Sequence, residues 1–130
     1  MNKWVFRIKV EPNGSRRFKA RLIVNGYSQR KGIDYAEIFS LVVKLTTIRI
    51  LLSIVATENS HLDQMDVKMT FLHGDLDEEI YMQQPEGFAA PGKEHMVYKL
   101  NKSLYGLKQA PRQWYKKFDS FMCKSGFHRS

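Results

Sequence analysis

The sequence has little cysteine and no long apolar run, and each absence narrows the class of protein. The one cysteine, Cys123, excludes an intrachain disulfide and a cysteine-rich zinc site, and its apolar neighbours predict a small core residue. The longest apolar stretch, residues 48–56, is interrupted by Arg49 and Ser53 and is too short to cross a membrane. No apolar signal segment follows the N-terminus. We therefore expect an intracellular protein that is not secreted and has no membrane partner.

The common short motifs for cofactors and metals are also missing. The chain has no phosphate-binding glycine loop and no glycine fingerprint of a dinucleotide fold. The acidic run at residues 75–79 lacks the alternation and the glycine of a calcium loop, which favours a solvated turn. The histidines are scattered without metal-ligand spacing: His61, His73, His95 and His128. We therefore expect no metal coordination by these histidines.

Positive charge, in contrast, is abundant. Lysine and arginine number 21 against 13 aspartates and glutamates, which gives a formal net charge of +8. The cations are concentrated in the first and last thirds of the chain, and the acids lie between them. Such a distribution attracts polyanions, either nucleic acid or an anionic membrane surface. An unevenly charged but solvated surface is the alternative that charge alone leaves open.

The length of 130 residues suits one domain, and 43% hydrophobic residues suffice for a core. Residues 4–10 and 18–24 alternate between apolar and polar side chains, as half-buried strands do. Asn13-Gly14 between them is a strong hairpin signal. The predicted hairpin presents cations on its wetter faces: Arg7, Lys9, Lys19 and Arg21.

Two further segments have helical periodicity. Residues 47–59 carry an apolar stripe that we expect to face a core, with Thr46 or Thr47 as the N-cap. A second helix is predicted to begin at Pro111 and end at Gly126. Its expected buried residues are Trp114, Phe118, Phe121 and Met122. Short strands are predicted at 62–67, 80–83 and 96–100. Strands and helices mixed in this way favour an α+β fold with an antiparallel sheet and packed helices.

Asp66 ends one of these predicted strands. A carboxylate at the end of an apolar strand is held firmly, and divalent cations prefer such oxygen ligands. Two-metal chemistry needs two or three converging carboxylates, so one aspartate by itself is weak evidence. Pairing with a nearby lysine, or capping of the next turn, is the structural alternative.

Residues 65–76 read Met-Asp-Val-Lys-Met-Thr-Phe-Leu-His-Gly-Asp-Leu. This segment resembles the block L-D-V-K-T-A-F-L-H-G-D-L of copia-type retrotransposon reverse transcriptases. Four more segments match that family in order and spacing: 19–24, 32–35, 81–88 and 104–114. The resemblance covers nearly the whole chain, and several long motifs in sequence make it specific.

The resemblance implies a fold and an activity. Residues 1–130 would form the fingers and the first part of the palm of a right-hand polymerase, a partial reverse transcriptase domain. The full enzyme would be an RNA-directed DNA polymerase of a Pol polyprotein. It would use two Mg²⁺ ions, deoxynucleoside triphosphates and an RNA or DNA template-primer, and the family acts in cytoplasmic particles.

The resemblance also assigns catalytic and metal-binding roles. Asp66 matches the first metal-binding aspartate of the palm, and the Val67 carbonyl would lie beside the same ion. Phe71 matches the aromatic residue beneath the incoming sugar, where its bulk would reject a 2′-hydroxyl. Met69 stands where the family usually has threonine, next to this site.

Nucleotide-binding roles fall on two other segments. Arg21 matches the fingers arginine that contacts the triphosphate, and Lys19 is a weaker candidate nearby. Arginine forks suit phosphate oxygens, which agrees with the hairpin prediction. Tyr105 and Lys108 match the loop that shapes the nucleotide pocket and grips the template.

The family's second catalytic motif, an aromatic residue followed by two aspartates, does not occur in these 130 residues. The thumb and any ribonuclease H domain are missing as well. We therefore expect a reverse transcriptase fragment that is inactive alone. A non-catalytic basic module that binds nucleic acid and a non-functional retroelement remnant are the alternatives. Host, expression and oligomeric state are left open.

Overall fold

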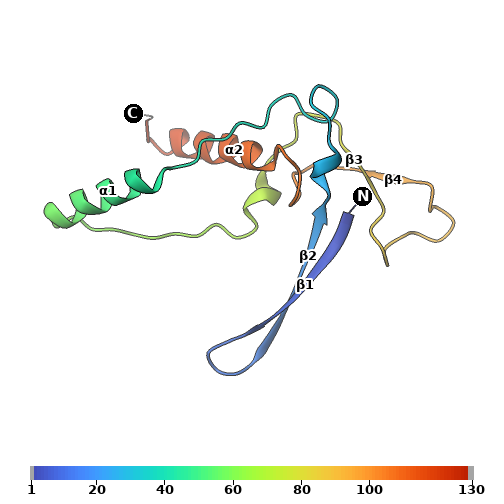
Figure 1. Ribbon diagram of the computed structural model, residues 1–130, viewed down its shortest axis with the longest axis horizontal. Helices are drawn as coiled ribbons and strands as arrows, with labels where there is room; N and C mark the ends of the chain where they lie inside the picture. Colours follow the sequence, from blue (N-terminus) through green and yellow to red (C-terminus); the bar gives the residue numbers. More distant parts are fainter. Residues whose placement is uncertain (1, 129–130) are drawn as a thin grey trace.

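The computed structural model describes residues 2–128 and shows a chain spread into separate arms (Figure 1). A long hairpin, β1 (Asn2–Val10) and β2 (Arg16–Val24), projects from a central junction. The helices α1 (Leu45–Thr57) and α2 (Ala110–Lys124) extend to one side of it. The short strands β3 (Tyr81–Gln83) and β4 (Val97–Lys99) extend to the other side.

The front hairpin confirms the sequence prediction. Its strands pair antiparallel in a register that places Phe6 opposite Ala20 and Arg7 opposite Lys19. The turn uses Asn13, whose side-chain oxygen accepts a hydrogen bond from the backbone N–H of Ser15 at 3.0 Å. Gly14 has a φ of 79°, a left-handed conformation that favours glycine.

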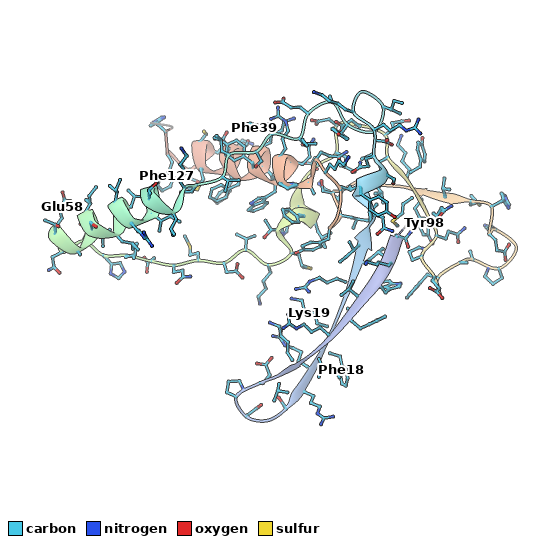
Figure 2. The ribbon with its side chains drawn as sticks, viewed as in Figure 1. Phe18, Lys19, Phe39, Glu58, Tyr98 and Phe127 are labelled. Atoms are coloured by element: carbon cyan, nitrogen blue, oxygen red, sulfur yellow. The ribbon has the colours of Figure 1, made fainter. Side chains whose placement is uncertain are left out.

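The register gives the hairpin two faces of opposite character, because alternate side chains point to opposite sides of a strand. One face carries the cations Lys3, Arg7, Lys9, Arg17, Lys19 and Arg21. The other carries the apolar residues Trp4, Phe6, Ile8, Phe18 and Leu22. Phe18 and Lys19, adjacent in β2, both lie on the projecting part (Figure 2).

The second hairpin is short. β3 and β4 pair antiparallel, inside the predicted ranges 80–83 and 96–100. The strand predicted at 62–67 is wrong, because the chain there has no regular secondary structure. The reason is that a strand needs a hydrogen-bonding neighbour, and no described strand pairs with this segment.

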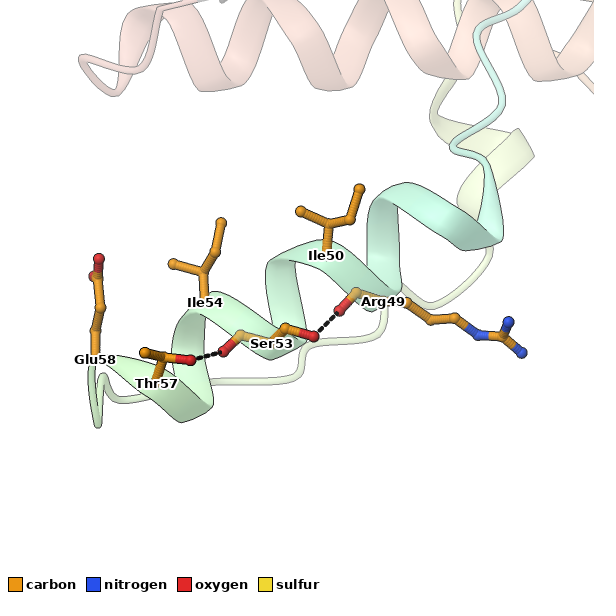
Figure 3. Close-up of a pocket in the computed structure, with 6 residues that line it drawn as sticks. All are labelled: Arg49, Ile50, Ser53, Ile54, Thr57 and Glu58. Atoms are coloured by element: carbon orange, nitrogen blue, oxygen red, sulfur yellow. Dashed lines mark hydrogen bonds between the residues drawn. The ribbon is translucent and has the colours of Figure 1, made fainter.

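The helix predicted at 47–59 exists as α1, but its apolar stripe does not face a core. No residue of α1 is buried, and Lys44, rather than a threonine, is the N-cap, without a side-chain hydrogen bond. Ile50 and Ile54 project from the same side of α1 into a shallow hollow formed by this helix alone (Figure 3). Periodicity thus predicted the helix but not its environment.

The helix α2 follows the predicted bounds closely, with Pro111 in its first turn and Gly126 just past its end at a φ of 89°. The prediction that α2 buries an apolar face is wrong for two of its four residues, and the other two, Trp114 and Met122, are only half-buried. Phe118 and Phe121 are 43% and 65% exposed. Cys123, predicted as a core residue, is exposed as well. Of the described chain, only the segment around the 3-10 helix η2 (Thr70–His73), through Met65, Val67 and His73, lies beside this side of α2, so most of its apolar residues stay in contact with solvent.

The buried core is small and lies at the junction of the arms. Its buried cluster consists of Ile80, Leu107 and Ala110, with Phe71 and Leu104 packed against it. The architecture is therefore mixed α+β with two small antiparallel sheets, which confirms the α+β class predicted from the sequence. Across residues 2–128, neither helix combines the length and the apolarity that a membrane span requires.

Candidate functional site

A shallow hollow of about 260 Å³ lies at the base of the front hairpin. Lys19 and Arg21 of β2 line one side, and Met69, Leu72 and Tyr105 line another. These residues come from chain segments up to 86 positions apart, Lys19 to Tyr105. The fold therefore brings together three of the sequence-predicted nucleotide-binding residues: Lys19, Arg21 and Tyr105.

Phe71 lies beside this hollow. Its ring meets the ring of Tyr105 edge-on, with centroids 5.2 Å apart, a preferred aromatic geometry. Phe71 belongs to the 3-10 helix η2 (Thr70–His73) and also packs against the core cluster. Phe71 is thus held in place from two sides.

A set of ion pairs holds the chain that follows η2 against α2. Asp75 pairs with Lys102 and with Lys117, the latter at 2.9 Å. Asp77 pairs with Lys116 at 2.6 Å and accepts a hydrogen bond from the buried Gln113 at 3.1 Å. Hydrogen bonds from Lys102 and Lys117 lower the pKa of Asp75 from 3.8 to about 2. Those from Lys116 and Gln113 lower the pKa of Asp77.

Like charges crowd the cationic face beside the hollow. The pKa of Lys19 is lowered, first by the charge of Arg21, then by desolvation and by the charge of Lys9. Lys19 lies directly opposite Arg7 in the register, and like charges in such pairs repel. Within the described chain, only Arg17 of this face has an acidic partner, Glu11 at 2.7 Å. An anion on this face would relieve the repulsion.

Lys108 lies apart from the hollow. Its ammonium donates a hydrogen bond to the backbone carbonyl of Gln29 at 2.9 Å and lies 5.3 Å from the ring centre of Tyr35. Its nucleotide-binding role remains a prediction. The hydrogen bond instead makes Lys108 part of the packing behind the Tyr105 loop.

Asp66 is exposed, belongs to no regular element and does not line the hollow. The carbonyl of Val67 accepts a hydrogen bond from the Thr70 hydroxyl at 2.8 Å, which leaves one lone pair free. In residues 2–128, no three His, Cys, Asp or Glu side chains are grouped so that they could hold a metal ion. A two-metal site needs several converging carboxylates, so a single carboxylate and one carbonyl do not fit two Mg²⁺ ions.

Sequence reasoning missed two residues of this region, Gln29 and Gln109. Gln109 is completely buried and bonded to Gln29 and to the backbone of Asp34. Glutamine carries no charge and has no periodic pattern, so only its place in the 104–114 motif pointed to it.

The fold and the site define an α+β protein whose cation-rich hairpin meets an aromatic pair at a shallow hollow. The family model for reverse transcriptase (RNA-dependent DNA polymerase) matches residues 1–130. The chain therefore belongs to the reverse transcriptase family, in agreement with its sequence motifs. No solved structure gives a significant match.

Individual relatives place the chain in retrotransposon Pol polyproteins of the copia type. It is 64% identical over 121 residues to the Retrovirus-related Pol polyprotein from transposon TNT 1-94 of Nicotiana tabacum, covering 92% of this chain and 9% of that protein. The polyprotein from transposon RE1 of Arabidopsis thaliana is 46% identical over 129 residues, covering 98% and 9%. The Transposon Ty1-BL Gag-Pol polyprotein of Saccharomyces cerevisiae is 31% identical over 106 residues, covering 82% and 6%. The chain thus spans less than a tenth of the length of these relatives.

Proposed function

We propose that this chain carries the nucleotide-facing residues and the first catalytic aspartate of an RNA-directed DNA polymerase. It would comprise the fingers and the first part of the palm. The observation that supports this most is the hollow in which Lys19 and Arg21 meet Tyr105, with Phe71 in contact with the Tyr105 ring. Two cations beside an aromatic wall suit a deoxynucleoside triphosphate, because guanidinium and ammonium groups bind phosphates and aromatic rings pack against sugar or base.

The proposed roles follow the family. Arg21 and Lys19 contact the triphosphate, Phe71 excludes a 2′-hydroxyl, and Asp66 with the Val67 carbonyl contributes to a Mg²⁺ site that needs further carboxylates. Tyr105 and Lys108 belong to the loop at the nucleotide and the template. With one carboxylate alone, the chain binds substrates but does not polymerise DNA.

Nucleotide binding tests the site. We expect the purified chain to bind dTTP, and Arg21→Ala to weaken this binding by roughly tenfold or more, since charge-assisted hydrogen bonds are lost. Arg16→Ala is the matched control, because Arg16 lies on the same strand but on the opposite face. Equal losses for both variants would show that only overall charge matters.

Sugar discrimination tests Phe71 separately. The wild-type chain should bind dTTP more tightly than the corresponding ribonucleotide, and Phe71→Val should reduce that ratio toward one, because a smaller side chain leaves room for the 2′-hydroxyl. A ratio that is unchanged by Phe71→Val would contradict the steric role.

Primer extension tests the absence of polymerisation. With Mg²⁺ or Mn²⁺ and a template-primer, we expect no extension above that of an Asp66→Ala control. Template-dependent extension well above this control would overturn the proposal that the chain is inactive alone.

The cationic hairpin face supports a second candidate, a non-catalytic module that binds nucleic acid. Six cations share this face, and one of them, Arg17, has an acidic partner in the described chain. Salt-dependent binding to an RNA–DNA hybrid would favour this function, since phosphate contacts release counterions. Lack of both binding and a cooperative melting transition would favour a non-functional remnant instead.

A further inference from the structure

A pair of glutamines from distant parts of the chain forms a brace behind the Tyr105 loop. The side-chain amide of Gln29 donates to the side-chain oxygen of Gln109 at 3.1 Å. Gln109 in turn donates to the backbone carbonyl of Asp34 at 3.0 Å. The backbone N–H of Lys108 donates to the side-chain oxygen of Gln29 at 2.8 Å. Each amide thus joins residues 25–34 to the loop 105–109.

Burial makes this brace energetically important. Gln109 has no exposed surface, and an amide removed from water is costly unless its donors and acceptor are bonded. Breaking one link leaves a buried partner without a hydrogen bond. The loop therefore has a strong preference for the position in which both amides are paired.

The brace continues into contacts that fix Tyr105 against β2. The backbone N–H of Val24 donates to the carbonyl of Tyr105 at 2.8 Å. A Cβ on Gly106 would lie 1.9 Å from the carbonyl oxygen of Val24, and one on Gly26 would lie 1.9 Å from that of Gly106. The loop and the end of β2 are thus in direct backbone contact, three residues beyond Arg21.

We propose that Gln29 and Gln109 are positioning residues that set the Tyr105 loop against β2 and thereby fix the distance between Tyr105 and Arg21 across the hollow. They act through the loop and do not touch a nucleotide. The Lys108 ammonium, bonded to the carbonyl of Gln29, supports the same contact. The link to nucleotide affinity rests on the proposed function, whereas the link to loop position does not.

Hydrogen exchange at single amides, measured by NMR on the full chain, tests the loop position. Gln29→Met and Gln109→Met keep the side-chain length and remove the hydrogen bonds without burying a charge. The Val24 N–H donates to the carbonyl of Tyr105 and to neither glutamine. The exchange rate of the Val24 amide therefore reports displacement of the loop. We expect each variant to raise this rate by about tenfold or more, as loss of a buried hydrogen bond predicts. The double variant should raise it by less than the product of the single effects, because both partners of one bond are then gone.

Gln84→Met is the matched control. Gln84 also bridges backbone segments with its amide, donating to Lys93 and Met96 and accepting from Ala90, but it lies beside the second hairpin. It should speed exchange at Ala90 and leave Val24 unchanged. The other amides of the front hairpin, which bond only across its two strands, provide the internal reference for global unfolding.

Binding of dTTP to the same variants provides the second readout. Affinity should fall in the rank order of the Val24 exchange rates, because a displaced loop lowers the fraction of binding-competent molecules. Unchanged Val24 exchange in both single variants would overturn the proposal. The proposal would also be overturned if the variants exchanged faster at Val24 but bound dTTP as tightly as a wild-type chain that binds it. Failure of the wild-type chain to bind dTTP counts only against the proposed function. The role of the two glutamines in loop position is tested separately, by the exchange rate of the Val24 amide.

Discussion

At the scale of single residues, paired charges define the surroundings of the site more than burial does. Asp75 and Asp77 are held by lysines of α2 and of the preceding loop, whereas the cations of the front hairpin crowd one another. The chain therefore has paired charges in the segment that follows η2 and mutually repelling cations on one face of the front hairpin. Cations that repel one another in this way are typical of a surface that binds an anionic ligand.

The low pKa of Asp75 predicts a pH dependence of stability. Hydrogen bonds from Lys102 and Lys117 lower this pKa from 3.8 to about 2 in the folded chain. The contribution is thus fully present above the unfolded value and is lost as the pH falls through the folded one. We expect Asp75→Asn to lower the melting temperature at pH 7, with the difference from wild type shrinking as the pH approaches 2 and vanishing below it.

Asp63→Asn is the control for this measurement. Asp63 is exposed, and its contact is with His61 at 3.2 Å, also exposed. Its substitution should leave the melting temperature nearly unchanged at both pH values. A difference for Asp75→Asn that persisted undiminished below pH 2 would show that lost packing, rather than lost charge pairing, causes the effect.

At the scale of elements, helices of similar length have different surroundings. No residue of the apolar side of α1 is buried, whereas the N-terminal turn of α2 supplies Ala110 and Gln113 to the buried region. The two helices should therefore contribute unequally to stability.

Leucine truncations measure that inequality. Leu107, just before α2, is 4% exposed, so Leu107→Ala should lower the free energy of unfolding by about 2–5 kcal/mol. Leu51 of α1 is 56% exposed, so Leu51→Ala should change it by less than about 0.5 kcal/mol. Urea unfolding of the two variants is the measurement. A large loss for Leu51→Ala would mean that α1 packs against another surface in solution.

The close contact of the Tyr105 loop with β2 predicts that a side chain at Gly106 lowers the stability of the fold. Gly106 has a φ of 96°, and a Cβ there would lie 1.9 Å from the Val24 carbonyl oxygen. Gly14 has a similar φ of 79° with open space around it. Gly14→Ala should cost about 1–2 kcal/mol through backbone strain alone, and Gly106→Ala about 3 kcal/mol or more, because the backbones must also separate. Equal costs in thermal unfolding would show that the loop can move away freely.

At the scale of the whole molecule, the chain exposes more surface than a compact protein of its size. Its accessible area is 10902 Å² at 15.2 kDa. A compact monomer of that mass exposes about 7,100 Å². The excess includes the apolar sides of α1, of α2 and of the front hairpin. An open shape of this kind predicts low stability and a tendency to aggregate.

The cationic face of the hairpin dominates the expected interaction with nucleic acid. Removing Arg7 and Lys9 together should reduce the slope of log affinity against log salt by about 2 for an RNA–DNA hybrid, since each phosphate contact contributes about 0.9. Replacing Lys44 and Lys93 by alanine removes the same charge from other parts of the molecule. If both double variants changed the slope equally in fluorescence titrations, net charge rather than the hairpin face would govern binding.

The sequence by itself determined the family and most of the local elements. Alternation around Asn13-Gly14 predicted the front hairpin, and Pro111 and Gly126 predicted the bounds of α2, because these signals depend on backbone geometry within a few residues. The motifs also pointed to Lys19, Arg21 and Tyr105, which the fold brings to one hollow.

Only the tertiary structure decided what surrounds each element. The tertiary structure left residues 62–67 without a strand partner and left the apolar stripe of α1 exposed. It also bonded the Lys108 ammonium to the backbone carbonyl of Gln29. It also joined Gln29 to Gln109 across 80 positions. The physical reason is that pairing, burial and buried amide bonds depend on contacts between distant segments, and neither periodicity nor a local turn signal records those contacts.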